Sequence, residues 1–169
     1  MIQLKSIYVT VGTTKFDALI EKIFSDDILL LLRRRGCKKI TVQYGTGKAP
    51  PVNKAQNYGI AVEIYQFKFG PERTDIINSD LTIGHAGAGT CMDILKNKKP
   101  GLVVVNDTLM DNHQVELAEQ LAKDSYIFQC NLSSLEKSLK VLDFETLVPY
   151  EKGRGMPAFI SHLREMMRT

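Results

Sequence analysis

Hydrophobic and polar residues follow two alternating patterns along the chain, and these predict strands and helices in turn. Short β-branched or apolar runs, typical of strands, occur at residues 7–11, 40–44, 61–65, 81–83, 101–105 and 126–129. Apolar residues spaced three or four apart predict helices at residues 16–23, 27–35, 73–78, 90–96, 112–123 and 133–142. This alternation predicts an α/β fold with a Rossmann-like, doubly wound parallel sheet.

Three segments refine this picture. Residues 102–105 are continuously apolar, as expected of a strand covered by helices on both faces. Residues 45–59 are rich in Gly, Pro and Asn, which predicts a mobile loop. The pattern weakens from residue 144 to residue 157, and an amphipathic helix follows with Phe159, Ile160, Leu163 and Met167 on one side. We therefore divide the chain into a Rossmann-like domain, residues 1–143, and a C-terminal extension, residues 144–169.

The composition suits one compact, soluble domain, and we expect no signal peptide to be cleaved from its N-terminus. The chain has 169 residues, of which 44% are hydrophobic, and its net charge of +3 favours a phosphate ligand or an anionic surface. The sequence lacks a basic stripe with interleaved aromatic residues, so it does not predict nucleic-acid binding. It also lacks an apolar run close to the roughly 20 residues of a membrane-spanning helix. Cys37, Cys91 and Cys130 lack the spacing of a metal site, which predicts reduced thiols in the cytosol.

The segment from Gly84 to Asp93 carries the strongest chemical signal. It follows a predicted strand, leads into a helix and contains three glycines and two alanines, so an anion can approach its backbone closely. The start of a helix offers unpaired N–H groups and the positive end of a dipole, which suit a phosphate or diphosphate. Thr90 and His85 add side-chain donors, and Asp93 lies about one turn further along, where a carboxylate can bind ribose hydroxyls.

Two further loops follow predicted strands at the same edge of the sheet. Residues 106–114 end in Asn112, His113 and Gln114, whose polar groups suit the hydroxyls of a sugar, although an ordinary exposed helix start has the same composition. Gly12, Thr13 and Thr14 form the other loop. That loop is less specific, because it suits phosphate, sugar or acceptor contacts and equally a simple turn of the chain.

Common nucleotide and metal motifs are missing from the sequence. Gly84, Gly87 and Gly89 stand in the wrong order for the dinucleotide fingerprint, and residues 45–48 lack the complete phosphate-binding P-loop pattern. No Asp-x-Asp pair offers a carboxylate clamp for a metal-bound diphosphate. The sequence therefore predicts no cofactor and no metal, and helix dipoles with hydrogen-bond donors would stabilise the leaving group.

Residues 9–17, 85–90 and 110–118 together resemble the catalytic subunits of the eukaryotic UDP-N-acetylglucosamine transferase that adds the second sugar in dolichol-linked oligosaccharide synthesis. The resemblance extends from about residue 7 to residue 130. It implies the C-terminal, donor-binding half of a GT-B glycosyltransferase, similar to one half of bacterial MurG. In this family a His-x-Gly loop binds the diphosphate, an acidic residue binds the ribose and a Gln contacts the sugar.

The resemblance and the loops together give one set of expected donor-binding residues. They are Gly12, Thr13, Thr14, His85, Gly87, Ala88, Gly89, Thr90, Asp93, Asn112, His113 and Gln114. Many related transferases have Glu in place of Asp93, and the shorter side chain would sit closer to the ribose or bind it through water. No general base is identified, and the partner is a possible source of it.

The expected function is transfer of N-acetylglucosamine, with inversion, from UDP-N-acetylglucosamine to N-acetylglucosaminyl-diphosphodolichol. The resemblance implies a membrane-anchored partner subunit that recruits the lipid acceptor, so that a cytoplasmic chain reaches the cytosolic face of the endoplasmic reticulum only through that partner. Two alternatives remain open: a non-catalytic UDP-sugar-binding module that regulates another enzyme, and a small nucleotide hydrolase, for which the sequence offers no nucleophile–base pair.

Overall fold

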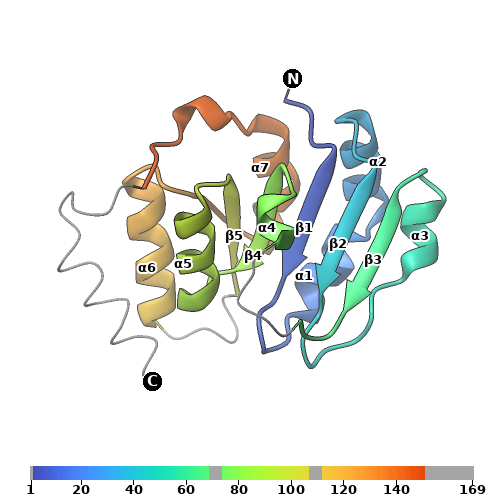
Figure 1. The fold of residues 1–169 in the computed structure, drawn as a ribbon, viewed down its shortest axis with the longest axis horizontal. Coiled ribbons are helices and arrows are strands. Elements are labelled where there is room, and N and C mark those ends of the chain that lie inside the picture. The colour runs from blue at the N-terminus through green and yellow to red at the C-terminus, as the bar shows by residue number, and fades with distance from the viewer. Residues whose placement is uncertain (1, 69–73, 107–111, 151–169) are drawn as a thin grey trace.

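A single parallel sheet of six strands forms the centre of the molecule (Figure 1). The computed structural model describes residues 2–68, 74–106 and 112–150. The strands stand in the order β3-β2-β1-β4-β5-β6, and every neighbouring pair is parallel. They are β1 (Ser6–Thr10), β2 (Lys39–Gln43), β3 (Ala61–Tyr65), β4 (Leu81–His85), β5 (Gly101–Val105) and β6 (Phe128–Asn131). The predicted Rossmann-like, doubly wound α/β fold is confirmed.

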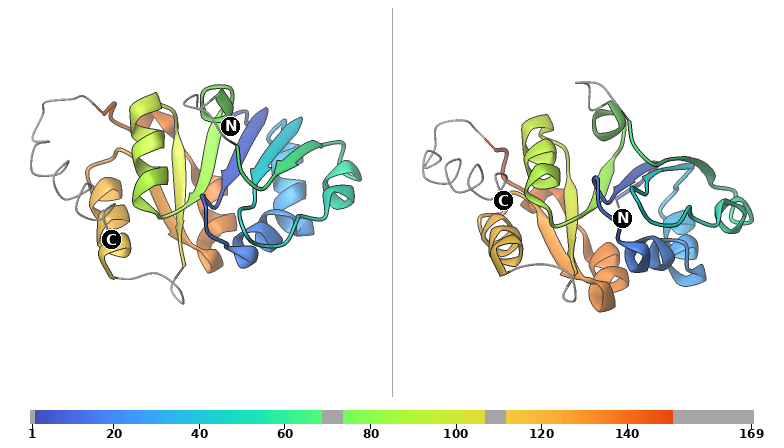
Figure 2. Two further views of the ribbon diagram at one scale, coloured as in Figure 1. Left: turned by 60° about the horizontal axis from the view of Figure 1, so that its bottom comes forward. Right: turned by 90° about the horizontal axis from the view of Figure 1, so that it is seen from below.

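Helices cover both faces of the sheet (Figures 1 and 2). One face carries α1 (Asp17–Ile23), α2 (Asp26–Arg34) and α7 (Leu135–Val141), and the other carries α4 (Thr74–Ile77), α5 (Ala88–Asn97) and α6 (Asn112–Lys123). A further helix, α3 (Val52–Gln56), lies at the outer edge beside β3. Two 3₁₀ turns, η1 (Leu132–Ser134) and η2 (Phe144–Thr146), flank α7.

Alternation along β5 shows how the two apolar layers form. Leu102 and Val104 belong to the cluster that packs against α1, α2 and α7, whereas Val103 and Val105 belong to the cluster beneath α5 and α6. All five residues of β5 are buried. The expectation of a strand covered on both faces is therefore confirmed for this part of the sheet.

The β1–β3 half of the sheet has one apolar face and one polar face. On the α1–α2 side, β1 and β2 contribute Ile7, Val9, Ile40 and Val42 to the core. Their alternate residues, which include Tyr8, Thr10 and Gln43, therefore lie on the opposite face. Within the ranges described above, no helix lies over β2 and β3 on that face (Figure 1). The carboxyl ends of β1–β3 thus remain open to a ligand.

Two expectations about local structure are wrong. Residues 45–59 are not loop throughout, because α3 forms over five of them and buries Ala55 in the core beside β3. The last strand begins at Phe128 rather than at residue 126, because Ser125 has a positive φ of 64° and Tyr126 still donates a backbone hydrogen bond to Leu121. Tertiary contacts of Ala55 favour α3, and the left-handed backbone of Ser125 delays the start of β6. The hydrophobic pattern reveals neither feature.

The C-terminal helix expected around Phe159, Ile160, Leu163 and Met167 lies outside the described residues. The division at residue 143 stays a prediction, although residues just beyond it contact the domain: the Phe128 and Phe144 rings lie 6.3 Å apart, and the Tyr126 and Tyr150 rings 5.7 Å apart. Across the described ranges, no helix is long and apolar enough to cross a membrane.

Candidate functional site

A pocket of about 520 Å³ opens at the carboxyl ends of the strands. Most of the expected donor-binding residues line it, namely Gly12, Thr13, Thr14, His85, Gly87, Ala88, Gly89, Thr90, Asp93 and Gln114. They come from the ends of β1 and β4 and from the first turns of α5 and α6. The side chains of Asn112 and His113 lie outside the described part of the chain. Residues from all three loops that the sequence singled out therefore meet at one site.

The start of α5 is built to leave backbone donors available. Gly87 is the N-cap residue, with an extended backbone (φ −79°, ψ 148°), and no side chain caps the helix. The first amides of the helix, from Ala88 onward, therefore have no partner within α5 itself. Since the helix dipole also places partial positive charge at this end, the pocket suits an anion here.

Two glycines around this helix start serve different needs. A Cβ atom at Gly87 would collide with the His85 ring, so packing requires glycine at this position. Outside its own helix turn, a Cβ atom at Gly89 would meet none of the described residues within 4 Å, because it would project into open space. Gly89 lines the pocket and is exposed, so a ligand there would contact a side chain at this position.

His85, the last residue of β4, contacts residues at the end of β1 and at the start of α5. Its Nδ1 lies 3.3 Å from Thr90 Oγ1, and a Cβ atom at Gly12 would lie only 2.8 Å from its Cε1. Burial lowers the pKa of His85, and a hydrogen bond to the backbone of Thr10 opposes this shift. The site therefore holds a neutral imidazole engaged by two neighbours, rather than the free cationic donor that a surface histidine would supply.

The loop after β1 is locked by backbone contacts. Gly12 has a positive φ of 65°, and the Thr14 hydroxyl donates to the Val11 carbonyl at 3.0 Å. The loop after β2 packs onto it, since the Thr46 amide donates to the Thr14 carbonyl at 3.0 Å. The Thr14 hydroxyl thus stabilises the turn, while Thr13 is exposed and lines the pocket.

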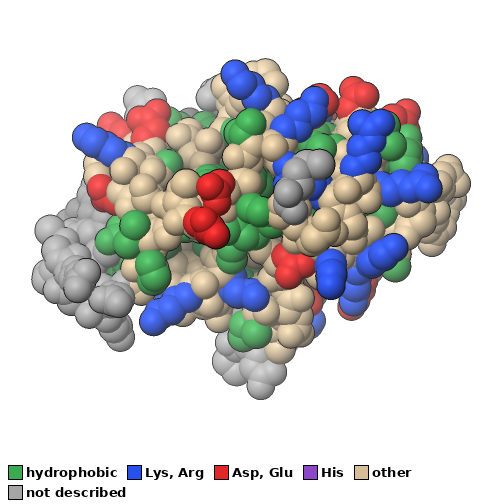
Figure 3. All heavy atoms as spheres, turned by 90° about the horizontal axis from the view of Figure 1, so that it is seen from above, with side chains coloured by type: hydrophobic (Ala, Val, Ile, Leu, Met, Phe, Trp, Pro, Cys, Tyr) green, Lys and Arg blue, Asp and Glu red, His purple; other side chains and the backbone are tan. Residues whose placement is uncertain are grey.

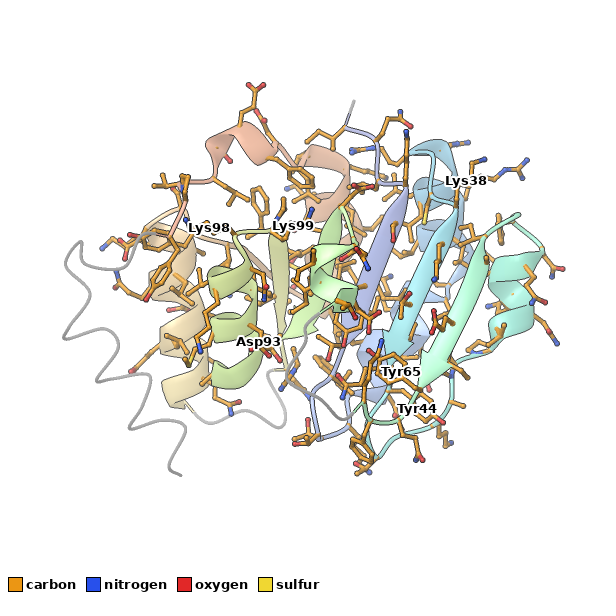
Figure 4. All side chains as sticks on the ribbon, viewed as in Figure 1. Lys38, Tyr44, Tyr65, Asp93, Lys98 and Lys99 are labelled. Carbon is orange, nitrogen blue, oxygen red and sulfur yellow. The ribbon has the colours of Figure 1, made fainter. Side chains whose placement is uncertain are left out.

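Asp93 and Gln114 supply polar side chains beyond the helix start. Asp93 lies one turn along α5, partly buried, as labelled in Figure 4, and Gln114 belongs to the first turn of α6. Cys91, also in the first turn of α5, is fully buried, and burial raises the pKa of its thiol to about 12. The thiol therefore stays protonated at neutral pH, and it does not serve as a nucleophile.

A second group of residues that line the pocket was not predicted from the sequence, namely Tyr8, Thr10, Gln43, Phe67, Lys68 and Ile76. The predicted residues lie in loops that follow strands, whereas these side chains stand on strands β1 and β2, just after β3, and on α4. One signal was available. Thr10 and Gln43 are the polar last residues of two adjacent apolar strands, at the edge where ligands bind.

Hydrogen bonds connect this second group into a network. The Thr10 hydroxyl donates to Gln43 Oε1 at 2.7 Å, and the Tyr8 hydroxyl donates to the same oxygen at 3.2 Å. The Tyr65 hydroxyl, which lies at the lower end of β3 in Figure 4, contacts Tyr8 at 3.1 Å and donates to Asp75. Burial, followed by the bond to Asp75, raises the pKa of Tyr65, so its phenol stays protonated.

The opposite end of the sheet is chemically different. A smaller hollow of about 290 Å³ lies there between α5 and η2, with mainly apolar lining and two lysines, Lys98 and Lys99. Lys and Arg side chains are spread over this end, with Asp and Glu among them (Figure 3). Within the described ranges, no group of three metal-ligating side chains comes together in either hollow. The pocket at the carboxyl ends is therefore the better candidate site.

Comparisons with known proteins agree on one family. The model of the glycosyltransferase family 28 C-terminal domain matches residues 6–166. The UDP-N-acetylglucosamine transferase subunit ALG13 of Mus musculus is 39% identical over 127 residues, which are 75% of this chain and 11% of that protein. The chain thus spans about a tenth of the mouse relative. The ALG13 subunit of Yarrowia lipolytica is 34% identical over 151 residues, covering 85% of this chain and 76% of that protein.

Solved structures give the same result. The solution structure of ALG13 superposes with a TM-score of 0.69 at 26% identity, covering 99% of this chain and 98% of that one. MurG of Acinetobacter baumannii shares the fold, with a TM-score of 0.62 at 18% identity over 99% of this chain and 50% of that one. The family resemblance expected from the sequence is therefore confirmed. The chain belongs to the glycosyltransferase family 28 C-terminal domains and, among them, to the ALG13 family of UDP-N-acetylglucosamine transferase subunits.

Proposed function

We propose that the chain binds UDP-N-acetylglucosamine in the 520 Å³ pocket and is the donor-binding, catalytic subunit of a two-component inverting glycosyltransferase. Its acceptor would be N-acetylglucosaminyl-diphosphodolichol, so the product carries the second sugar of the lipid-linked oligosaccharide used in N-glycosylation. One observation carries this proposal. The uncapped start of α5, the Asp93 carboxylate and the Gln114 amide converge on a single pocket.

Each part of the donor has a matching group in the pocket. The diphosphate would bind the amides at the start of α5 together with the Thr90 hydroxyl, and the ribose hydroxyls would bind Asp93. Gln114, on the neighbouring helix, would contact the sugar. The planar base would lie where aromatic and aliphatic side chains, Tyr8, Phe67 and Ile76, line the same pocket.

The proposed reaction is an in-line displacement. The acceptor hydroxyl forms a bond to the anomeric carbon while the bond from that carbon to the UDP oxygen breaks, so negative charge develops on the diphosphate. The α5 amides and dipole stabilise that charge. A general base takes the acceptor proton. In the described pocket His85 is engaged by its neighbours and Asp93 is assigned to the ribose, so we assign the base to the partner subunit.

A membrane-anchored partner would bring the acceptor to this pocket. The acceptor is a lipid, whereas the described residues include no helix able to cross a membrane. The relatives of this chain are themselves named as subunits. We therefore propose that the chain is cytoplasmic and reaches the cytosolic face of the endoplasmic reticulum through that partner.

Two measurements on the full chain test the proposal. Titration with UDP-N-acetylglucosamine should shift the backbone amides of Gly87, Gly89 and Thr90, and shifts confined to other regions would disprove the site. The chain with its membrane subunit and labelled donor should form disaccharide lipid, while the chain alone should form little. Binding without product in the complete mixture would instead favour a non-catalytic, regulatory UDP-sugar module.

A further inference from the structure

Gln43 presents only one kind of hydrogen-bonding group to the pocket. Its Oε1 accepts from the Thr10 hydroxyl at 2.7 Å and from the Tyr8 hydroxyl at 3.2 Å. An amide oxygen has two lone pairs, and these two donors occupy both of them. Among the described residues, none accepts a hydrogen bond from Gln43 Nε2. The side chain therefore offers a ligand two N–H donors and no acceptor.

The network also fixes which way the amide faces. Thr10 Oγ1 accepts a hydrogen bond from the Gly12 amide at 3.1 Å, so its own hydrogen is directed to Gln43. If the amide turned over, Gln43 Nε2 would face the Thr10 and Tyr8 hydroxyls, and the hydrogen of Thr10 would lose its acceptor. Because a buried or partly buried donor without a partner is costly, the observed orientation is the favoured one.

Register places Gln43 at a defined distance from Gly84, the strand residue three positions before the N-cap of α5. Gln43 pairs with Thr10 across β2 and β1, and Thr10 pairs with Gly84 across β1 and β4. These three residues form one row across three strands, and two strand spacings amount to about 10 Å. A ribose and a pyrimidine ring extend over a similar length, so a nucleotide whose diphosphate lies at α5 can bring its base to Gln43.

The surroundings of Gln43 suit a flat ring with a polar edge. Phe67 is 37% exposed and Ile76 is 3% exposed, and both line the pocket together with Tyr8. Apolar and aromatic surfaces contact the faces of a base, while its carbonyl groups remain to be hydrogen-bonded at the edge. Gln43 lines the same pocket, and its Nε2 can supply a donor to such an edge.

We propose that Gln43 is a specificity-determining residue whose Nε2 donates to the 4-carbonyl oxygen of uracil and thereby selects uracil over cytosine. This inference rests on the proposed function, since it requires the nucleotide to occupy this pocket. Cytosine has an amino group at the same ring position. With cytosine, two donor groups would face one another, and neither would find an acceptor.

Binding of UDP and of CDP to the full chain tests this assignment. We expect the unmodified chain to prefer UDP. Gln43→Met removes the donors at similar length and without adding charge, so the UDP dissociation constant should rise about tenfold, as expected for one lost hydrogen bond. The CDP dissociation constant should change by less than about twofold, because cytosine gains nothing from the Gln43 donors. Pyrophosphate binding, which needs only the α5 start, should be unchanged.

A second variant reverses the chemistry. Gln43→Glu keeps an oxygen for Thr10 and Tyr8 but presents a second acceptor to the base, so it should favour CDP over UDP. The negative charge that Gln43→Glu adds repels both nucleotides. Gln66→Glu is the matched control for this added charge, because Gln66 is exposed, follows β3 and does not line the pocket. Gln66→Glu should leave the ratio of UDP to CDP affinity unchanged.

Two outcomes would overturn the assignment. If the unmodified chain binds UDP with shifts at Gly87 and Gly89, but Gln43→Met leaves the UDP-to-CDP ratio unchanged, base recognition by Gln43 is wrong while the proposed function stands. If the unmodified chain binds neither nucleotide, the proposed function fails, and the inference fails with it. Amide spectra of each variant establish that a change in ratio does not arise from unfolding.

Discussion

The two halves of the pocket would recognise the proposed ligand by opposite means. The helix-tip half, formed by Gly87, Gly89, Thr90, Asp93 and Gln114, relies on small residues and on the uncapped backbone of α5. The strand half, formed by Tyr8, Thr10, Gln43, Phe67 and Ile76, relies on side chains held by one another. An anion is best bound where side chains are absent, because the backbone donors must be reached. Selection of a base requires side chains in fixed orientation.

The helix-tip half should therefore be most sensitive to an added side chain. Gly89→Ala places a methyl group where, outside its own helix turn, none of the described residues lies within 4 Å, so the fold should tolerate it. Alanine is the better helix former, and we expect the free energy of unfolding to rise by up to about 1 kcal/mol. The same methyl group would stand in the path of the diphosphate, and the UDP dissociation constant should rise roughly 30-fold, the equivalent of ~2 kcal/mol for one charged hydrogen bond.

Calorimetric titration and urea unfolding of the same Gly89→Ala protein check both effects. Gly87→Ala is the matched comparison, because its Cβ atom would collide with His85 and should destabilise the protein as well as weaken binding. Unchanged UDP affinity in Gly89→Ala would show that the diphosphate does not approach the start of α5.

Thr10 should affect both halves of the pocket, since it bonds to Gln43 in the strand half and to His85, which contacts Thr90 in the helix-tip half. Its hydroxyl accepts from the Gly12 amide, next to His85, and donates to Gln43. Thr10→Val keeps the shape but removes both bonds, so we expect a loss of about 1–2 kcal/mol in stability and roughly a tenfold loss of UDP affinity. The preference for UDP over CDP should also fall, because the Gln43 amide becomes free to turn. Retained preference would mean that Tyr8 alone orients Gln43.

The same contrast explains how much the sequence could predict. The fold followed from hydrophobic patterning, because each strand between two helix layers has to be apolar, as residues 101–105 are. The helix-tip half was visible as a run of small residues between a strand and a helix, a local feature that needs no knowledge of neighbours. A five-residue helix such as α3 was not visible, since burial of Ala55 decides it rather than propensity.

The strand half could not be predicted by the same reasoning. The strand half brings together residues that are far apart in the sequence: 57 positions separate Tyr8 from Tyr65, and Gln43 lies between them. They meet only because β1, β2 and β3 pair in one register. A polar residue at the end of an apolar strand is a weak signal by itself, because surface exposure produces the same pattern. Strand order supplies the missing information, and the parallel pairing of β1 with both β2 and β4 is a non-local property.

The smallest expected effect concerns the acid sensitivity of the helix-tip half. Burial holds the pKa of His85 below its ordinary value, so the folded chain resists protonation that the unfolded chain accepts near pH 6.5. His85 therefore contributes full stability above pH 6.5, and this contribution is lost as the pH falls from 6.5 through the lower pKa of the folded state.

Urea unfolding at pH 7.5, 6.0 and 5.0 should show the unmodified chain losing more stability than His85→Gln, in which the other two histidines remain. Saturating UDP should reduce the difference, because the bound diphosphate favours the imidazolium form. Equal acid losses in both proteins would show that burial does not lower the pKa of His85 in the folded chain.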